Sequence, residues 1–307
     1  MLTPPRCELQ SVSTSRGSLV YYSPSPLDSV APLPQESNSD ETVTVPTKST
    51  LVFLHGFGGG SSAYEWSKVY PAFAGRYRVV APDLLGWGRS HHPTRSLTLD
   101  DYLTSLTEFL AALGDDPVVV IASSLTAGMV VKLAIAQPQR FRSLILVAPT
   151  GLSDFGVDYG DSLIAQVSQV AGINQLLYWT AIANPFSIRS FLEQRQFARA
   201  SRVSSEMVEA YTQSAQQPHA DYAALSFLQG QLSFDLADLI PQLTTPTALI
   251  WGRESQLTPV EMGDRLRMLN PTAIQSLTIL DDVGLTPHLE VPAVTIGVLT
   301  QLLQTLA

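Results

Sequence analysis

The sequence is almost without cysteine, since Cys7 is the only one among 307 residues. One thiol cannot form an internal disulfide framework or a cysteine metal cluster, so both are excluded. Basic residues are also few, because 18 Lys and Arg stand against 27 Asp and Glu, which gives a formal net charge of −9. This charge repels phosphate backbones and anionic lipid, and we therefore expect no nucleic acid as a partner.

Long apolar runs are absent as well. The opening MLTPPRCELQ lacks the basic and then apolar segments of a signal peptide, and no apolar stretch is long enough to span a bilayer. We therefore expect a cytoplasmic protein with no transmembrane segment, and the sequence carries no signal for an oligomeric state. Hydrophobic residues still make up 45% of the chain. A chain of this size buries roughly three quarters of the surface that its unfolded form exposes, so one elaborated domain is expected.

The most informative stretch is VVVIASSLTAGM, which contains Ser124. Its first four residues are β-branched and typical of a buried parallel strand, and a helical pattern begins at Leu125. Small residues join the two parts, which predicts a tight turn. The stretch resembles the nucleophile elbow G-x-S-x-G of the α/β-hydrolases, with Ala122 and Thr126 in place of the glycines. The resemblance makes Ser124 the nucleophile and the Leu125 N–H an oxyanion-hole donor. The alternative is a serine at a strand end or helix cap.

A second stretch, LVFLHGFGGGSS, begins with a predicted strand at residues 51–54 and continues into a cluster of glycines. It has neither the G-x-G-x-x-G of dinucleotide sites nor the Gly-Lys-Ser/Thr end of a Walker loop, so no cofactor is expected. It resembles the oxyanion loop of α/β-hydrolases, which assigns the Phe57 backbone N–H to the hole, while His55 is expected to be structural. The stretch PDLLGWGRSHHP also resembles this family. Its pair His91 and His92 has no further ligand nearby, so we expect no metal site.

Strand and helix patterns alternate along the chain, which predicts an α/β fold with a doubly wound, mostly parallel sheet, as the resemblance also implies. The core is expected to comprise residues 1–153 and 236–307, with 25–48 as an exposed loop rich in proline and serine. Residues 154–235 have a helical pattern and resemble the cap that this family inserts after its sixth strand. Strands are expected twice within residues 6–24, at 51–54, 77–81, 118–121 and 141–148, and before Trp251 and Leu280.

The predicted cap is rich in apolar residues, among them Leu163, Val167, Leu176 and Trp179. Such a segment packs as a helical layer on the main domain, and some of its side chains are expected to line an apolar cavity. A small apolar ligand or substrate is therefore the expected partner. The arginines of the same segment are expected to form a solvated helix face: Arg189, Arg195, Arg199 and Arg202.

The resemblance fails where a serine hydrolase needs its base and its acid. In this family the acid follows the seventh strand in a Trp-Gly-x-x-Asp pattern, and the histidine follows the eighth strand in a Gly-His pattern. The corresponding positions here are Ser255 and Leu285. Neither a serine hydroxyl nor a leucine accepts a proton near neutral pH, so the resemblance implies a degenerate triad around Ser124.

Neighbouring residues are candidates to replace these groups. His288 lies three residues after Leu285, which on a helix puts their Cβ atoms about 5–6 Å apart. A general base must come within about 3 Å of the hydroxyl, so the alternative for His288 is a structural residue at a helix start. Glu254 precedes the acid position by one residue. More remote candidates are Asp154, Asp281, Asp282 and His219.

Three functions are compatible with these features. The first is a serine hydrolase acting on a carboxylic ester with an apolar substrate, with Ser124 as nucleophile and a recruited histidine as base. Its turnover should be slow, because losing the serine or histidine of a triad costs about 10⁶ in turnover, while the oxyanion hole and binding retain roughly 10³ to 10⁴ over water. The second is a non-catalytic protein that binds an apolar ligand. The third is a partner-binding protein that uses the surface of the predicted cap.

Overall fold

The computed structural model describes residues 6–25, 49–157, 159, 175–176 and 178–306. Nearly all of the loop predicted at 25–48 lies outside this part of the chain. The described residues contain eight strands, all close to the predicted positions: β1 (Cys7–Thr14), β2 (Gly17–Pro24), β3 (Thr50–Leu54), β4 (Arg78–Pro82), β5 (Val118–Ser123), β6 (Phe141–Val147), β7 (Thr247–Gly252) and β8 (Ile274–Leu280).

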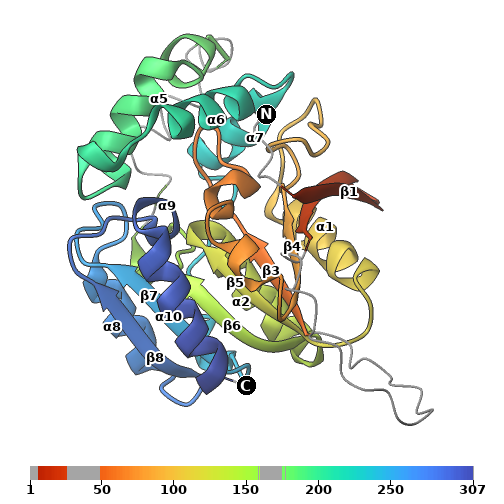
Figure 1. Ribbon diagram of the computed structural model, residues 1–307, viewed down its shortest axis with the longest axis vertical. Coiled ribbons are helices and arrows are strands. Elements are labelled where there is room, and N and C mark those ends of the chain that lie inside the picture. The colour runs from red at the N-terminus through yellow and green to blue at the C-terminus, as the bar shows by residue number, and fades with distance from the viewer. Residues whose placement is uncertain (1–5, 26–48, 158, 160–174, 177, 307) are drawn as a thin grey trace, which may run out of the picture.

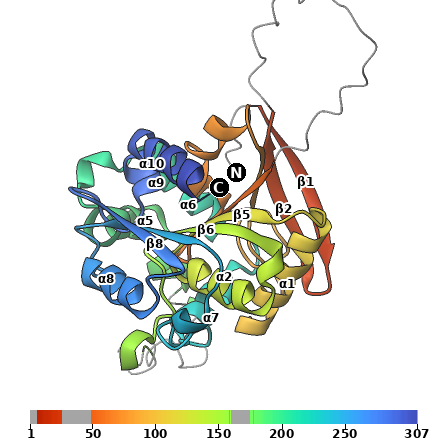
Figure 2. The same ribbon diagram turned by 90° about the horizontal axis from the view of Figure 1, so that it is seen from below.

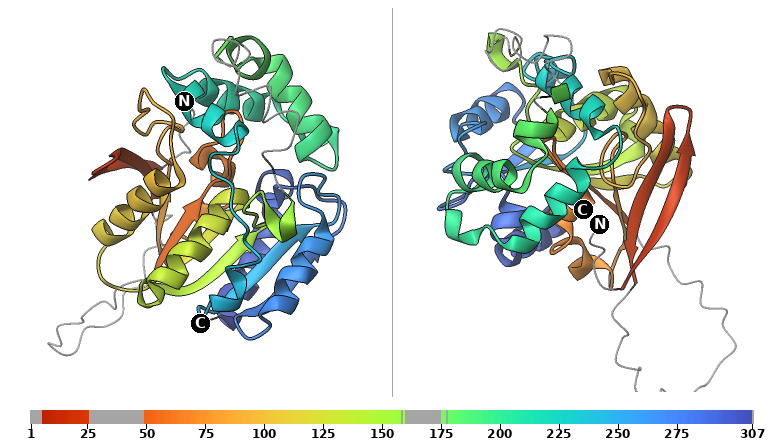
Figure 3. Two further views of the ribbon diagram at one scale, coloured as in Figure 1. Left: turned by 180° about the vertical axis from the view of Figure 1, so that it is seen from behind. Right: turned by 90° about the horizontal axis from the view of Figure 1, so that it is seen from above.

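These strands form one sheet in the order β1-β2-β4-β3-β5-β6-β7-β8. The pairs β1–β2 and β2–β4 are antiparallel, and the others are parallel. The predicted doubly wound, mostly parallel sheet is therefore confirmed. Strand β1 forms one edge, where the β1–β2 hairpin extends along the side of the molecule (Figure 3). Strand β5 lies inside the sheet between β3 and β6, and all of its residues are buried, which explains its continuous β-branched sequence.

Helices cover both faces of the sheet. Figure 2 shows α1 (Leu99–Ala112), α2 (Ser124–Ala136) and α8 (Val260–Leu269) on one face and α10 (Pro292–Thr305) on the other. Helix α1 begins with a capping box, because Thr98 accepts the backbone N–H of Asp101 while the Asp101 carboxylate accepts the backbone N–H of Thr98. Within the described residues, none of the helices has the length and apolarity that a membrane crossing requires.

Between β6 and β7 the chain forms helices at one end of the sheet (Figure 1). The chain leaves the sheet near Leu152 and returns near Phe234, and these two residues form an isolated parallel bridge. We call the described helices between them the inserted helices. They are η4 (Asp154–Gly156), η6 (Tyr178–Ile182), α5 (Pro185–Phe191), η7 (Leu192–Gln196), η8 (Ala200–Arg202), α6 (Ser205–Ala215) and α7 (Ala220–Leu228).

The inserted helices pack on the loop that follows β3. The Ser214 hydroxyl of α6 donates to the Ser61 carbonyl at 3.1 Å. A Cβ atom at Gly60 would overlap the backbone carbonyl of Tyr211, and Gly60 has a φ of +94°. Glycine is therefore required there both by the conformation and by the close approach of α6. The short helix η1 (Ala63–Trp66) follows this loop, all four of its residues are buried, and two side-chain hydrogen bonds link it to α6.

Candidate functional site

Ser124 lies at the junction of β5 and α2, at the sharp turn that the sequence predicts. Its φ is +55°, a left-handed conformation that is costly for a residue with a Cβ atom. Ser124 is the first residue of α2 and is half-buried. The first N–H groups of a helix have no acceptor within the helix, and the N–H of Leu125, the second residue of α2, is one of them. The geometry is that of a serine presented at a strained strand-to-helix turn.

The Gly56–Phe57 segment lies directly against this turn. A Cβ atom at Gly56 would stand 3.2 Å from the Ser123 Oγ and 3.4 Å from the Ser124 Cβ. A side chain at position 56 would therefore crowd the two serines, and the glycine lets the loop after β3 contact the serine turn. The Phe57 ring packs edge-on against Trp87 and Tyr102, at centroid distances of 5.3 and 5.0 Å, which fixes the loop.

Thr126 holds the two segments together. Its hydroxyl donates to the backbone carbonyl of His55 at 2.7 Å, and its side chain is fully buried. The threonine that replaces the second glycine of the G-x-S-x-G pattern therefore acts as a tie between α2 and the loop. The His55 ring accepts the N–H of Leu84 through Nε2 at 3.0 Å. This contact agrees with the structural role predicted for His55.

The two positions at which the family carries its acid and its histidine come from adjacent loops. A Cβ atom at Gly252, at the end of β7, would overlap the carbonyl of Gly284, so the loops after β7 and β8 touch. Ser255 is buried, and its hydroxyl pairs with that of Thr258 at 3.1 Å. Leu285 is buried, and its N–H donates to the Gln196 carbonyl at 2.8 Å. A hydroxyl and a hydrocarbon side chain thus occupy these positions.

Glu254 is exposed, and its carboxylate is bound by the backbone of the loop after β8. Its carboxylate accepts the N–H of Val283 at 2.8 Å, and its own N–H donates to the Val283 carbonyl at 3.0 Å. These bonds fasten the loop after β7 to the loop after β8. They do not connect Glu254 with the serine turn.

His288 is fully buried in α9 (Pro287–Glu290), and its ring stacks on Trp66 with centroids 3.9 Å apart and planes within 11°. Its Nε2 lies 3.7 Å from Glu65 Oε2, which is too long for a hydrogen bond. Among the described residues neither ring nitrogen has a hydrogen-bond partner, Ser124 included. Burial lowers the pKa of His288, so the ring is neutral at pH 7.

Glu65 is a member of the site that sequence reasoning missed. Its Oε2 accepts the Gly56 N–H at 2.9 Å, and its Oε1 accepts the Tyr211 hydroxyl at 3.1 Å. Burial alone would raise its pKa, but the adjacent His288 and His55 rings outweigh burial and lower the pKa to about 2. A buried, ionised carboxylate therefore lies against Gly56, next to the serine turn.

The low pKa of Glu65 predicts a loss of stability in acid. Because an unfolded glutamate titrates near 4.3, the unfolded chain takes up this proton first as the pH falls. The ionised Glu65 therefore contributes to the free energy of unfolding above that pH. This contribution, on the order of 3 kcal/mol by linkage, should be lost between about pH 4.5 and pH 2. Urea unfolding across this pH range should show a shallower decline for Glu65→Gln than for the wild type. Parallel curves would contradict the assignment.

The remaining acidic candidates are engaged elsewhere. The Asp154 carboxylate accepts the N–H groups of Gly151 and Leu236 at 2.9 and 2.8 Å and the Thr150 hydroxyl at 2.5 Å. It therefore braces the start and the return of the inserted segment. Asp281 pairs with Arg253, and His219 is exposed.

The predicted arginine helix face does not extend to Arg199 and Arg202, although the Arg199 side chain is 60% exposed. Both bind Asp282, at 2.6 and 2.8 Å, and Arg202 also binds the fully buried carboxylate of Glu290 at 2.7 Å. These residues lie in and beside η8 rather than on one long helix, so the spacing on which the prediction rested does not exist. They fasten the inserted segment to the loop after β8. Arg189 does lie on a helix surface, paired with Glu193 at 3.1 Å.

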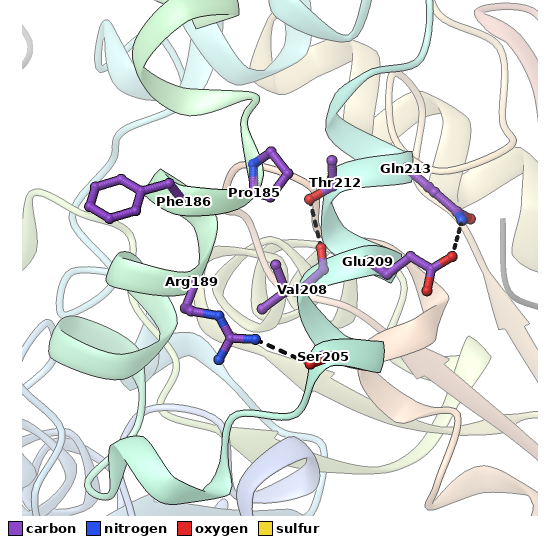
Figure 4. Close-up of a pocket in the computed structure, with 8 residues that line it drawn as sticks. All are labelled: Pro185, Phe186, Arg189, Ser205, Val208, Glu209, Thr212 and Gln213. Atoms are coloured by element: carbon purple, nitrogen blue, oxygen red, sulfur yellow. Dashed lines mark hydrogen bonds between the residues drawn. The ribbon is translucent and has the colours of Figure 1, made fainter.

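Of the residues expected to line an apolar cavity, Leu163 and Val167 lie outside the described residues. Leu176 and Trp179 are 64% and 42% exposed. A pocket of about 480 Å³ does lie between α5 and α6, where Arg189 reaches toward Ser205 and the Phe186 ring points away from α6 (Figure 4). None of the residues around Ser124 lines it.

The described residues contain no group of three or more His, Cys, Asp or Glu side chains placed to hold a metal ion. In the histidine pair, His92 uses Nε2 to contact the carbonyl of Gly88 at 3.1 Å. Burial lowers the pKa of His92, which keeps it neutral.

Comparisons with known proteins agree with this architecture. A family model described as alpha/beta hydrolase fold matches residues 49–284. The 2-hydroxymuconate semialdehyde hydrolase of Pseudomonas sp. (strain CF600) is 29% identical over 221 residues, which cover 69% of this chain and 72% of that protein. The uncharacterized hydrolase YugF of Bacillus subtilis (strain 168) is 24% identical over 254 residues, covering 80% and 85%.

Solved structures show the same fold at lower sequence identity. A thermophilic esterase from Thermogutta terrifontis superposes with a TM-score of 0.72 at 19% identity, covering 97% of this chain and 99% of the esterase. A serine hydrolase involved in carbazole degradation gives a TM-score of 0.73 at 17% identity, with coverage of 97% and 99%.

Proposed function

Because this chain belongs to the alpha/beta hydrolase fold family, we propose that it is a slow serine hydrolase acting on a carboxylic ester of an apolar substrate. The observation that carries the proposal is the strained turn at Ser124. A φ of +55° costs free energy at a residue with a side chain, and it presents the hydroxyl beside the glycine loop. The esterase and the hydrolases among the similar proteins support the choice of hydrolysis.

In the proposed reaction the Ser124 hydroxyl attacks the ester carbonyl, and the N–H groups of Phe57 and Leu125 receive the developing oxyanion. The alcohol leaves, and water then hydrolyses the acyl-enzyme. Within the described chain no side chain is hydrogen-bonded to Ser124, so the hydroxyl proton passes to water. Without a base at the Leu285 position, the only rate enhancement should be the one that binding and the oxyanion hole supply, which is roughly 10³ to 10⁴ over the reaction in water.

We further propose that residues 154–235 act as a cap over this site. The contacts of α6 with the loop after β3 support this role, since that loop carries Phe57. A cap that excludes water strengthens the interaction of the N–H dipoles with an oxyanion.

A second candidate function is binding of an apolar ligand without turnover. Two observations favour it: Leu285 is a buried hydrocarbon where the family has its base, and His288 is stacked against Trp66 rather than bonded to Ser124. The ligand would then lie beside the serine turn, and the Ser124 hydroxyl would contribute one hydrogen bond.

Ser124 should be the residue that reacts with an alkyl fluorophosphonate. The expected result is slow covalent labelling of the wild type that Ser124→Ala abolishes, because Ser124 has the strained backbone and is partly exposed. Ser123→Ala is the matched control, since Ser123 is its neighbour but is buried, and it should retain the labelling. Intact-protein mass spectrometry with peptide mapping gives the measurement.

Hydrolysis of a p-nitrophenyl acyl ester separates the two functions. Turnover that disappears in Ser124→Ala supports the hydrolase. Ester turnover of equal rate in the wild type and Ser124→Ala would show that the serine is not the nucleophile. Thermal stabilisation by a long-chain fatty acid ester, with neither labelling nor turnover, would favour the binding function.

A further inference from the structure

Glu65 belongs to a chain of buried hydrogen bonds that links the two loops of the site. The Gly56 N–H donates to Glu65, and the Tyr211 hydroxyl donates to the other oxygen of the same carboxylate. The Gln196 amide in turn donates to the Tyr211 oxygen at 3.3 Å and to the Thr286 hydroxyl at 3.0 Å. The backbone carbonyl of Gln196 accepts the N–H of Leu285.

This chain runs through the interior. Glu65, Tyr211, Gln196 and Thr286 are each at most 5% exposed. Buried polar groups are costly unless they are paired, and a satisfied network of such groups fixes one arrangement of the segments that carry it. Its two ends are the backbone at Gly56 and the backbone at Leu285. Its middle comes from the inserted helices, since Tyr211 is in α6 and Gln196 ends η7.

The bond to Gly56 acts directly on the loop that faces Ser124. The Gly56 N–H and the Phe57 N–H are consecutive donors on one backbone, so orienting the first restricts the second. A Cβ atom at Gly56 would stand 3.4 Å from the Ser124 Cβ and 3.6 Å from Glu65 Oε2, so Ser124 and Glu65 both lie beside the same side of Gly56. A shift of this loop would misplace the Phe57 donor relative to Ser124, and oxyanion stabilisation depends on donor geometry.

We infer that Glu65 is a positioning residue for the Ser124 site, which holds the Gly56–Phe57 backbone in place and links it through Tyr211 to the inserted helices. The inference rests on the proposed function for its chemical consequence. Among the described residues no hydrogen bond joins Glu65 to the Ser124 hydroxyl, and the role we assign to Glu65 is to accept hydrogen bonds from Gly56 and Tyr211 rather than to take up a proton.

Two substitutions separate positioning from proton transfer. Glu65→Gln keeps the shape and one carbonyl oxygen, which can still accept the Gly56 N–H, while its amide can donate to the Tyr211 oxygen. Glu65→Ala removes both bonds. If Glu65 is a positioning residue, Glu65→Gln should retain the Ser124 reactivity that Glu65→Ala loses. If Glu65 were a general base, both variants should lose that reactivity equally.

The first readout is hydrogen exchange at the Gly56 amide, followed by mass spectrometry of peptides that cover residues 55–62 or by NMR. We expect exchange at least about tenfold faster in Glu65→Ala than in the wild type, and within about threefold of the wild type in Glu65→Gln. Tyr211→Phe should also speed exchange at Gly56. The matched control is Tyr64→Phe, because Tyr64 of η1 donates to Glu206 of α6 at 2.9 Å and thus links the same two helices without contacting Gly56.

The second readout is the rate of Ser124 labelling by the alkyl fluorophosphonate. It should fall about tenfold or more in Glu65→Ala, and it should be retained in Glu65→Gln and Tyr64→Phe. Unchanged Gly56 exchange in Glu65→Ala would overturn the inference, as would a Glu65→Gln variant as impaired as Glu65→Ala. If Glu65→Ala does not fold, the comparison of Tyr211→Phe with Tyr64→Phe decides on the same exchange measurement. A wild type that is never labelled would refute the proposed function and leave the exchange result standing.

Discussion

Introducing His at position 285 and Asp at position 255 in one chain is expected to raise ester turnover by at least about a hundredfold. Triad residues act as a unit, and losing the histidine from a complete triad costs about 10⁶ in turnover, so restoring the pair should recover part of that range. The loops that carry the two positions touch at Gly252 and Gly284, which brings the new imidazole and carboxylate from adjacent segments. Initial rates with p-nitrophenyl acyl esters provide the measurement.

The single variants are the matched controls. Leu285→His alone supplies a base without an orienting acid, and Ser255→Asp alone supplies an acid without a base, so each should gain far less than the pair. Adding Ser124→Ala to the double variant should return turnover to the background. A gain that survives Ser124→Ala would mean that the new histidine acts on its own and that the elbow serine is not part of the reaction.

The sequence predicted the sheet well because each of its strands is a short buried run with a clear end. Residues 118–121 are continuously β-branched, and the structure places all of β5 in the interior. The turn at Ser124 was predictable for a related reason, since only small residues join this strand to α2. Patterns of this kind depend only on the residues of one segment and on whether that segment is buried, so they can be recognised in a single sequence.

Glu65 was not predictable in this way. It sits between Tyr64 and Trp66 in a four-residue helix, with no spacing that relates it to Ser124. Its partners Gly56, Tyr211 and His288 come from three separate parts of the chain. The signal that could have found it is an acidic residue flanked by aromatics, since such a carboxylate must either be solvated or be paired in the core.

The arginine prediction failed because it assumed one continuous helix. Arg199 and Arg202 lie where the chain has left η7 and forms only the short helix η8. Their side chains point toward the loop after β8, because they form salt bridges there with Asp282 and Glu290. Charge spacing along a sequence predicts a solvated face only where the helix that carries it extends through all of the charges.

Replacing Glu290 by Ala is expected to lower the free energy of unfolding by about 3–5 kcal/mol, which is the cost of removing one partner from a buried ion pair. The Glu290 side chain is fully buried. Its carboxylate accepts the N–H groups of Gly284, Ala198 and Arg199 at 2.7 to 3.1 Å in addition to the Arg202 guanidinium. Alanine would leave these donors without an acceptor inside the protein. Urea unfolding followed by far-UV circular dichroism measures the change.

The exposed pair Arg189 and Glu193 provides the matched control. It is also a pair of one arginine with one glutamate, at 3.1 Å, but both side chains reach solvent, at 38% and 30% exposure. Glu193→Ala should therefore change the free energy of unfolding by no more than about 0.5 kcal/mol. Because Glu290 ties the loop after β8 to the inserted segment, Glu290→Ala should also speed amide exchange at Gly284 and Ala198 together. Equal effects of the two substitutions on stability would show that burial of Glu290 does not determine its contribution.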